Sequence, residues 1–373
     1  MKVAYLLGSL NRGGTETLVL DVFKKASQAP FQVVGIHRKG GAYLPDFKAT
    51  GEKMIALAPR FVGDVSYFVK LRRLLQRERV DVVHAQQCLD AVYARIACVG
   101  TGIKVVQTFH GYDFNAGKLM RRFMRFSAHL VDANFFVSAS QRDYYIKSYQ
   151  LKDHHKQHVV YNGVNFDKLD EISASVELPI GSNPASQGLK LAMVGNFVRG
   201  REQNTVCQFL KLLKEAGVPF DFYFVGRKSE SEPWLYDDCV AYCQEHQLLD
   251  CVHFLGGRGD VPAILKQLDA FIYSTDHDTF GIAVIEAIAA GVPTFVNDWE
   301  VMVEITQQGR WATIYKTKDA ADLFNKFITF VDHKEHYKQQ ACSHAQEVRN
   351  TYSIEKHIQT LSNLYSACNA LNP

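Results

Sequence analysis

Apolar runs of strand length alternate with helix-length segments along most of this chain, and this alternation constrains the fold more than any other feature. Parallel strands need a crossover connection that is usually a helix, so repeated alternation predicts parallel sheets wrapped by helices. In the first half, the predicted strands are 2–7, 31–37, 80–84, 104–108, 132–137 and 158–161, with helices at 15–28, 65–78 and 90–99.

The second half of the chain repeats this pattern. Its predicted strands are 189–194, 220–225, 252–255 and 270–274, and its predicted helices are 203–216, 233–247, 260–268 and 281–290. A chain of 373 residues is long for a single core. We therefore expect an α/β protein with two doubly wound parallel-sheet domains, 1–170 and 189–351, joined by a polar linker at 171–188.

Charge is distributed unevenly between the two halves. Residues 1–170 contain 25 Lys and Arg against 14 Asp and Glu, whereas residues 171–373 contain 17 against 25. A basic first domain predicts an anionic partner. The chain lacks the clustered basic and aromatic pattern of a nucleic-acid module, so we expect a membrane surface or an anionic acceptor and no nucleic acid.

Cellular location is predicted from the cysteines and from the apolar runs. The eight cysteines are scattered, and only Cys239 and Cys243 lie close in sequence, without a second pair at zinc spacing. Free thiols in a reducing cytoplasm are expected. No apolar run is long enough to span a bilayer, and the first residues lack the cleavage region of a signal peptide.

A glycine-bearing turn follows the first predicted strand. Gly13 and Gly14 stand directly before a helix, but the turn matches neither the dinucleotide fingerprint Gly-x-Gly-x-x-Gly nor the P-loop ending Gly-Lys-Ser/Thr. Glycines let a ligand approach the backbone, and the free N–H groups of a helix start favour an anion. The turn is therefore either a phosphate contact or a simple tight connection.

His110 follows the predicted strand at 104–108. Ligands of open α/β sheets collect beyond the carboxyl ends of strands, which is where His110 should lie. We regard it as a candidate for contact with a reacting group, and a purely structural role is the alternative.

A basic amphipathic segment begins at Lys118. Such a helix can lie on an anionic membrane surface, which would place the protein peripherally on the inner face of a membrane. The alternative is a surface helix packed on its own domain. The basic stripe consists of Lys118, Arg121, Arg122 and Arg125, and the apolar stripe consists of Leu119, Phe123, Phe126 and Leu130.

A second glycine turn follows the strand at 189–194. It runs from Gly195 through Asn196 and Arg199 to Arg201, and a helix begins just after it. A strand, a glycine turn with arginines and a helix start together form a credible diphosphate cradle.

The segment from Asp278 to Pro293 is apolar and rich in alanine apart from its acidic residues. Glu286 is the only charged side chain between Ile282 and Val296. A helix that is apolar on most sides is normally buried, and a buried carboxylate needs a bonding partner. If 281–290 is a helix, Ile282 lies on its apolar side and Glu286 lies among alanines on the opposite strip. Glu286 then either binds a ligand or is a solvated glutamate on a half-exposed helix.

These motifs together resemble the GT-B glycosyltransferases, and among them the family 4 retaining nucleotide-sugar enzymes, also described as group 1 glycosyl transferases. The resemblance extends along nearly the whole chain. It rests on Gly13-Gly14-x-Glu16, His110-Gly111, Asn162-Gly163-Val164, Val194-Gly195 with Arg201, Phe254-Leu255-Gly256 and, most specifically, Asp278-x-Phe280-Gly281-x-x-x-x-Glu286-Ala-x-Ala-x-Gly291-x-Pro293.

Three positions depart from the family pattern. The first acidic residue is usually Glu, and Asp278 is one methylene shorter, so its hydroxyl contact would be rearranged. The family usually has Lys where this chain has Arg201, and Arg where it has Asn196. Arg199 is a candidate to replace the charge lost at Asn196.

The resemblance implies two Rossmann-like domains facing across a cleft whose closure gates turnover, with a C-terminal helix at about 352–370 crossing back to the first domain. It implies transfer of a sugar, with retention, from a UDP- or GDP-sugar to a glycan or lipid-linked acceptor. The setting would be bacterial-type cell-surface polysaccharide, lipopolysaccharide or glycolipid synthesis. The nucleotide sugar is a substrate, so no cofactor and no metal requirement are expected.

The resemblance also implies a role for each site residue. Glu286 would bind the ribose hydroxyls, Asp278 the hydroxyls of the transferred sugar, and His110 the sugar near its reacting carbon. No enzyme nucleophile is needed, because the leaving phosphate accepts the acceptor's proton, and stabilisation of the departing diphosphate is the main catalytic contribution. The remaining donor-binding residues would be Gly13, Gly14, Asn196, Arg201, Phe280, Gly281 and Ile282 at the diphosphate, and Gly256 and Arg258 at the base.

Three alternatives remain open. Asp276-His277-Asp278 matches the Asp-x-Asp signature that holds a metal in the other glycosyltransferase fold, although its place before Phe280-Gly281 argues against that role. The protein could instead be a nucleotide-sugar epimerase of GT-B shape, which would convert a donor without any acceptor. It could also be an inactive nucleotide-sugar-binding protein.

Overall fold

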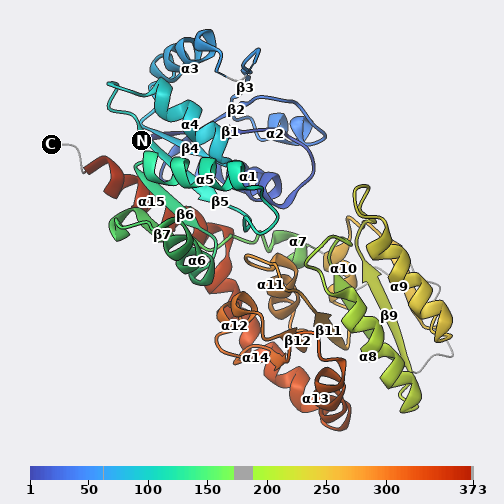
Figure 1. Ribbon diagram of the computed structural model, residues 1–373. Coiled ribbons are helices and arrows are strands. Elements are labelled where there is room, and N and C mark those ends of the chain that lie inside the picture. The colour runs from blue at the N-terminus through green and yellow to red at the C-terminus, as the bar shows by residue number, and fades with distance from the viewer. Residues whose placement is uncertain (62, 172–187, 371–373) are drawn as a thin grey trace. The chain divides into compact units, whose positions relative to one another are not determined.

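The computed structural model describes residues 1–61, 63–171 and 188–370, and it divides into two compact units (Figure 1). The first unit contains Met1–Gly163 and the C-terminal residues from Ser353, and the second contains Val164–Tyr352. Most of the predicted linker at 171–188 lies outside the described residues. Each unit is a parallel sheet with helices packed on it, so the predicted doubly wound α/β class is confirmed.

The first unit is built on a seven-stranded parallel sheet in the order β3-β2-β1-β4-β5-β6-β7. The strand order reverses between β1 and β4, which pair in register. Ligands of such sheets bind at this switch point, beyond the carboxyl ends of the strands. The strands are β1 (Lys2–Leu7), β2 (Gln32–His37), β3 (Met54–Ala56), β4 (Val82–Ala85), β5 (Lys104–Phe109), β6 (Ala133–Phe136) and β7 (Gln157–Val159).

Helices cover both faces of this first sheet. The predicted helix at 15–28 ends early, because the backbone N–H of Lys25 closes the last turn and a 3₁₀ turn follows. The elements are α1 (Gly14–Lys24), η1 (Ala26–Gln28), α2 (Leu44–Ala49), α3 (Val65–Arg77), α4 (Cys88–Ala97), α5 (Lys118–Leu130), α6 (Ala139–Tyr149), η2 (His154–Lys156) and α15 (Ile354–Ala370).

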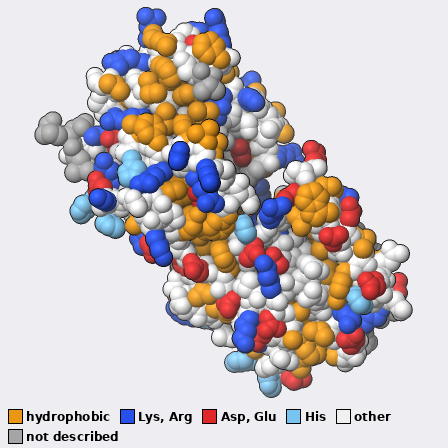
Figure 2. All heavy atoms as spheres, in the orientation of Figure 1, with side chains coloured by type: hydrophobic (Ala, Val, Ile, Leu, Met, Phe, Trp, Pro, Cys, Tyr) orange, Lys and Arg blue, Asp and Glu red, His pale blue; other side chains and the backbone are white. Residues whose placement is uncertain are grey.

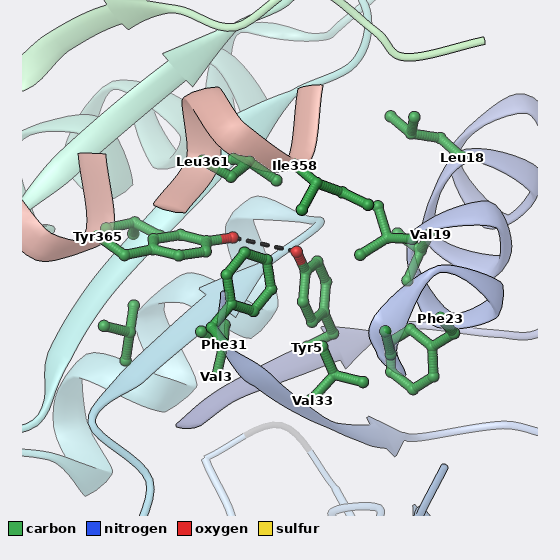
Figure 3. Packing of buried hydrophobic residues seen from close by; sticks show 14 of the residues in the cluster. Val3, Tyr5, Leu18, Val19, Phe23, Phe31, Val33, Ile358, Leu361 and Tyr365 are labelled. Carbon is green, nitrogen blue, oxygen red and sulfur yellow. Dashed lines mark hydrogen bonds between the residues drawn. The ribbon is translucent and has the colours of Figure 1, made fainter. Parts of the chain in front are cut away.

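Alternate residues of β1 supply the two cores of the first unit. Tyr5 packs with α1 and α15 on one face, whereas Leu6 packs with α3 and α4 on the other. Figure 3 shows the first core, where the hydroxyl of Tyr365 on α15 lies 3.1 Å from that of Tyr5. The final helix therefore completes the core of the first unit. It begins at Ile354, just after the preceding helix ends at Tyr352.

The second unit contains a six-stranded parallel sheet in the order β10-β9-β8-β11-β12-β13, which again reverses beside its first strand. None of the described helices in either unit combines the length and apolar character needed to cross a bilayer. The strands are β8 (Leu189–Val194), β9 (Phe220–Val225), β10 (Val252–Gly256), β11 (Ala270–Tyr273), β12 (Thr294–Asn297) and β13 (Thr313–Tyr315). The helices are α7 (Asp167–Asp170), α8 (Gln203–Glu215), α9 (Trp234–Glu245), α10 (Val261–Leu265), α11 (Ile282–Ala289), α12 (Glu300–Ile305), α13 (Ala320–Asp332) and α14 (Lys334–Tyr352).

Candidate functional site

The loops after β8 and β11 meet at the switch point of the second sheet. Arg201 and Thr275 form an isolated antiparallel bridge, and the Thr275 hydroxyl donates to the Gly200 carbonyl at 2.7 Å. Gly200 has φ 89°, and a Cβ there would lie 2.3 Å from the Cβ of His277. Only glycine fits such a position, so the glycine turn predicted as a diphosphate cradle is held against the loop that carries Asp278.

Asp278 is fixed from several directions in this loop. Its Oδ2 accepts hydrogen bonds from the Arg201 guanidinium and the Tyr273 hydroxyl. Its backbone carbonyl accepts from Trp299 Nε1 at 2.8 Å, and its N–H donates to the Thr275 hydroxyl at 3.2 Å. The sequence predicted Asp278 and Arg201 as separate contacts of one ligand, and the structure joins them as an ion pair.

The N-terminus of α11 lies three residues beyond Asp278. Gly281 is the N-cap with φ 87°, and a Cβ there would lie 2.8 Å from Met302 Cε. Phe280 is buried against the ring of Tyr352, and this packing fixes the path of the backbone into α11. Gly281 supplies no side-chain cap, so the first N–H groups of α11 are suited to an anion.

Glu286 lies on the outer strip of α11 and is half-buried. The expectation that Ile282 belongs to the apolar side is wrong, because Ile282 and Ala283 are also partly exposed while Val284 and Ile285 are buried. The partly exposed strip of α11 therefore consists of Ile282, Ala283, Glu286 and Ala290, whereas Ala287 and Ala289 are buried, so a ligand can approach Glu286 past Ala283 and Ala290.

The other predicted donor-binding residues of the second unit have partners within the protein. Asn196 Oδ1 accepts from the backbone N–H of Arg227 at 2.9 Å, which stabilises the turn after β9. Arg199 pairs with Glu232 at 3.1 Å. Gly256 ends β10 with φ 67°, and the Arg258 that follows it makes two hydrogen bonds to Asp260, at 2.9 and 2.6 Å.

Three further residues at this edge were not predicted. Tyr273 and Trp299 both bond to Asp278, as described above, and nothing in their sequence positions signals that contact. Arg227 lies against Gly257, where a Cβ would come within 2.6 Å of its side chain, and no described residue bonds to its guanidinium. The position of Arg227 directly after β9 could have indicated it as a candidate ligand contact, because ligands bind beyond the carboxyl ends of parallel strands.

The two acids of the Asp-x-Asp pattern face different partners. Asp276 bonds to Lys318 Nζ at 2.6 Å and to His277 Nδ1 at 2.5 Å, whereas Asp278 faces Arg201. Burial disfavours the charged form of Asp276, but its bonds to Lys318 and His277 outweigh this and lower its pKa. Each acid is thus neutralised by a cation of the chain.

His110 is half-buried at the carboxyl edge of the first sheet, beside two buried histidines, His84 and His357. Its Nε2 is 2.8 Å from Gln86 Oε1, and since an amide oxygen only accepts, the ring donates there. Burial lowers the pKa of His110 to about 4, with a smaller contribution from His357. Burial also lowers the pKa of His84 well below its usual range and that of His357 to about 4. All three rings are therefore neutral at pH 7.

Gly13 and Gly14 lie at the exposed N-terminus of α1. Gly13 is the N-cap without a side-chain bond, and Gly14 has no atom within 4 Å of a Cβ built on it. Nothing in the fold of the first unit requires glycine at position 14. Space beside this helix start is open to a ligand.

Ser127 and Ala128 are the buried residues of helix α5, and Phe123, Met124 and Leu130 are partly buried. Leu119 is 82% exposed and Phe126 is 54% exposed. Arg121 donates to two backbone carbonyls, at Asp113 and Phe114. Figure 2 shows hydrophobic side chains gathered over α3, α4 and α5 on this face, with Lys and Arg side chains clustered over α5.

Two family models match the chain in succession. The model described as Glycosyltransferase Family 4 matches residues 12–168, and the one described as Glycosyl transferases group 1 matches residues 178–345.

Several characterised proteins are similar to this chain. UDP-Gal:alpha-D-GlcNAc-diphosphoundecaprenol alpha-1,3-galactosyltransferase of Escherichia coli is 23% identical over 98% of this chain and 96% of its own length. N-acetyl-alpha-D-glucosaminyl L-malate synthase of Bacillus anthracis is 22% identical over 81% of this chain and 78% of its own.

Solved structures share the fold at low identity. Anabaena Alr3699/HepE in complex with UDP and glucose superposes with a TM-score of 0.82 at 15% identity, over 98% of this chain and 100% of that one. A glycosyltransferase from Rickettsia africae ESF-5 superposes with a TM-score of 0.83 at 16% identity, over 100% and 99%.

Proposed function

This chain is a GT-B glycosyltransferase of the family 4 and group 1 type, and we propose that it moves a sugar from a UDP-sugar to a lipid-linked or glycan acceptor with retention of configuration. A role in bacterial cell-surface polysaccharide or glycolipid synthesis is supported by the E. coli relative, whose name gives a UDP-galactose donor and a diphosphoundecaprenol-linked acceptor. Support for UDP also comes from the UDP-bound structural neighbour.

The observation that carries this proposal is the order of groups around the start of α11. Asp278 precedes a helix start without a side-chain cap, Arg201 lies beside it, and Glu286 follows on the outer strip of the helix. A nucleotide sugar has the same order of chemistry: sugar hydroxyls, a diphosphate, and a ribose diol. Carboxylates accept from hydroxyls, whereas a guanidinium and helix N–H groups bind phosphate.

In this proposal, catalysis is electrostatic. Arg201 and the start of α11 stabilise the charge that develops on the leaving diphosphate, and that phosphate accepts the acceptor's proton on the same face. Asp278 binds a sugar hydroxyl, and no enzyme nucleophile is needed because the leaving phosphate accepts the acceptor's proton. In the first unit, we assign His110 to the sugar, and Gly13 and Gly14 to the diphosphate.

For the acceptor side, we propose that α5 places the protein on an anionic membrane surface. Lys118, Arg121, Arg122 and Arg125 would meet the lipid phosphates, while Leu119 and Phe126 would enter the interface. Val65 on α3 and Val99 after α4 are also exposed apolar residues of the first unit. Arg72 on α3 ties the two helices together through a 2.6 Å bond to the Val99 carbonyl.

Calorimetry with UDP and GDP tests the donor assignment. UDP should bind the wild type, and Glu286→Ala should weaken that binding by about 1–3 kcal/mol, because the ribose loses a charged hydrogen-bond partner. Glu335→Ala, which removes an exposed carboxylate from α14, is the control. Repeating the titration and the transfer assay in EDTA should change neither, since both acids of the Asp-x-Asp pattern already pair with cations of the chain.

Three results would contradict the proposal. Unchanged UDP affinity in Glu286→Ala would remove the ribose role, and tighter binding of GDP than of UDP would change the donor class. Conversion of the donor sugar in the absence of any acceptor would indicate the epimerase alternative instead.

A further inference from the structure

Tyr273 is the last residue of β11, at the start of the loop that carries Asp278. Its side chain is 1% exposed, yet its hydroxyl reaches the carboxylate of Asp278. Burial raises the pKa of this hydroxyl, so it stays protonated and can only donate to the carboxylate. A buried phenol that donates to a functional acid constrains where that acid points.

Both protein bonds to the Asp278 carboxylate fall on the same oxygen. Arg201 and Tyr273 donate to Oδ2, and among the described residues no donor bonds to Oδ1. A carboxylate oxygen with two donors resists rotation about the terminal side-chain bond, because both charge-assisted bonds would break. Oδ1 is therefore held in one direction and keeps its capacity to accept from a ligand hydroxyl.

The same phenol ring also holds the cation. The Arg201 guanidinium lies over the Tyr273 ring, with Cζ 5.1 Å from the ring centroid. The backbone of Tyr273 is itself anchored, since its carbonyl accepts from the Tyr315 hydroxyl on β13 at 2.8 Å. Tyr273 thus contacts both members of the Asp278–Arg201 pair from a rigid strand end.

We propose that Tyr273 is a positioning residue that fixes Asp278 on Arg201 through Oδ2 and so presents Oδ1 to a hydroxyl of the transferred sugar. The assignment rests on the proposed function, because it takes Asp278 as the sugar contact and Arg201 as the diphosphate contact. Its consequence is that sugar recognition depends on the Tyr273 hydroxyl, whereas recognition of UDP alone does not.

The test compares two affinities in each variant by calorimetry. UDP and the tightest binder among UDP-glucose, UDP-galactose and UDP-N-acetylglucosamine are titrated into the wild type and into Tyr273→Phe, which keeps the ring over Arg201. We expect UDP to bind Tyr273→Phe within about twofold of the wild type, while the additional affinity that the sugar confers falls by about five- to tenfold. Tyr149→Phe removes another buried hydroxyl, bonded to Asp113 Oδ2 at 2.8 Å in the first unit, and should change neither affinity.

A double variant separates positioning from general stability. In an Asp278→Asn background, the charged oxygen that Tyr273 holds is gone, so adding Tyr273→Phe should have much less effect on the sugar-dependent affinity than it has in the wild type. If Tyr273→Phe weakened UDP and UDP-sugar binding equally, the hydroxyl would have only a structural role and the inference would be overturned. The same conclusion would follow if Tyr273→Phe had as large an effect in Asp278→Asn as in the wild type.

The outcome also distinguishes the inference from the proposed function. If the wild type binds no UDP, the proposed function fails and this inference fails with it. If the wild type prefers a UDP-sugar over UDP and Tyr273→Phe keeps that preference, only the inference fails.

Discussion

Gly281 at the start of α11 and Gly14 at the start of α1 are glycines for different reasons. Gly281 is required by the fold, because its φ is 87° and a Cβ would contact Met302. Gly14 is not, because the space around it is open. Where the fold does not need a glycine at the start of a helix, close approach of a ligand to the backbone is the remaining physical reason for it.

Alanine substitutions at these two glycines should therefore separate stability from activity. Gly281→Ala should lower the free energy of unfolding by about 1–2 kcal/mol, since alanine is strained at positive φ. Gly14→Ala should leave it unchanged or raise it by up to about 1 kcal/mol, as alanine favours a helix. Urea unfolding followed by far-UV circular dichroism measures both.

Gly14→Ala also tests the donor contact. Gly14→Ala should slow sugar transfer despite its full stability, because a methyl group would stand where the diphosphate approaches. Wild-type turnover by Gly14→Ala would show that Gly14 makes no donor contact.

Helix α5 is the element whose sequence pattern and packing agree least with a purely internal role. A helix that serves only its own domain buries its apolar stripe, but in α5 Phe123 and Leu130 are only partly buried and Leu119 and Phe126 are exposed. Arg121 is committed to the loop before the helix, whereas the described structure contains no bond from Lys118 or Arg122 to another side chain. Lys118 and Arg122 are thus the better positions at which to test the membrane proposal.

Sedimentation with vesicles of phosphatidylglycerol, and of phosphatidylcholine alone, tests α5. Lys118→Glu with Arg122→Glu should reduce binding to the anionic vesicles by more than about tenfold, because each basic residue contributes about 1 kcal/mol at such a surface. Leu119→Ser with Phe126→Ser should also weaken it without loss of stability. The matched control is Lys48→Glu with Lys356→Glu, which makes the same charge change at exposed positions elsewhere in the first unit. Equal binding by all these proteins would leave α5 as a surface helix.

At the scale of the whole molecule, the two units differ in how they respond to acid. The three histidines with strongly lowered pKa, His84, His110 and His357, all belong to the first unit. Unfolding exposes them and restores a pKa of about 6.5, so below that pH the unfolded chain binds more protons than the folded one. The stability they provide is present above pH 6.5 and is lost as the pH falls towards 4.

We expect the first unit to lose up to about 1.4 kcal/mol per pH unit for each of these histidines between pH 6.5 and 4. All three tryptophans, Trp234, Trp299 and Trp311, lie in the second unit, so their fluorescence reports on that unit alone. Urea unfolding at pH 5 should therefore show a transition in circular dichroism that precedes the one in tryptophan fluorescence. At pH 7.5 the two transitions should lie closer together, because the first unit then keeps the stability that the three histidines cost it at pH 5.

His357→Gln is the control for this pH dependence. It removes one titrating group and should make the first transition less sensitive to pH. An unchanged pH dependence in His357→Gln would mean that this ring does not drive the acid response.

The alternation of strands and helices determined the two-sheet fold and nearly every central strand, because strands buried on both faces are continuous apolar runs that stand out in the sequence. It missed the edge strand β3, where Met54 and Ile55 are partly buried and Ala56 is exposed, and also the short buried strand β12, which lies inside the second sheet directly after Pro293. The motif from Asp278 to Glu286 likewise identified the acids and the helix between them, since its spacing is local.

Only the tertiary structure decided how those acids are held. Asp278 meets Tyr273 across a loop, Arg201 from another strand end and Trp299 from the next connection, and contacts between distant segments leave no local periodicity to detect. The same holds for Tyr365, which completes the first core from the far end of the chain. The sequence therefore determined which chemical groups lie at the sheet edge, and the packing of loops decided which of them act as pairs.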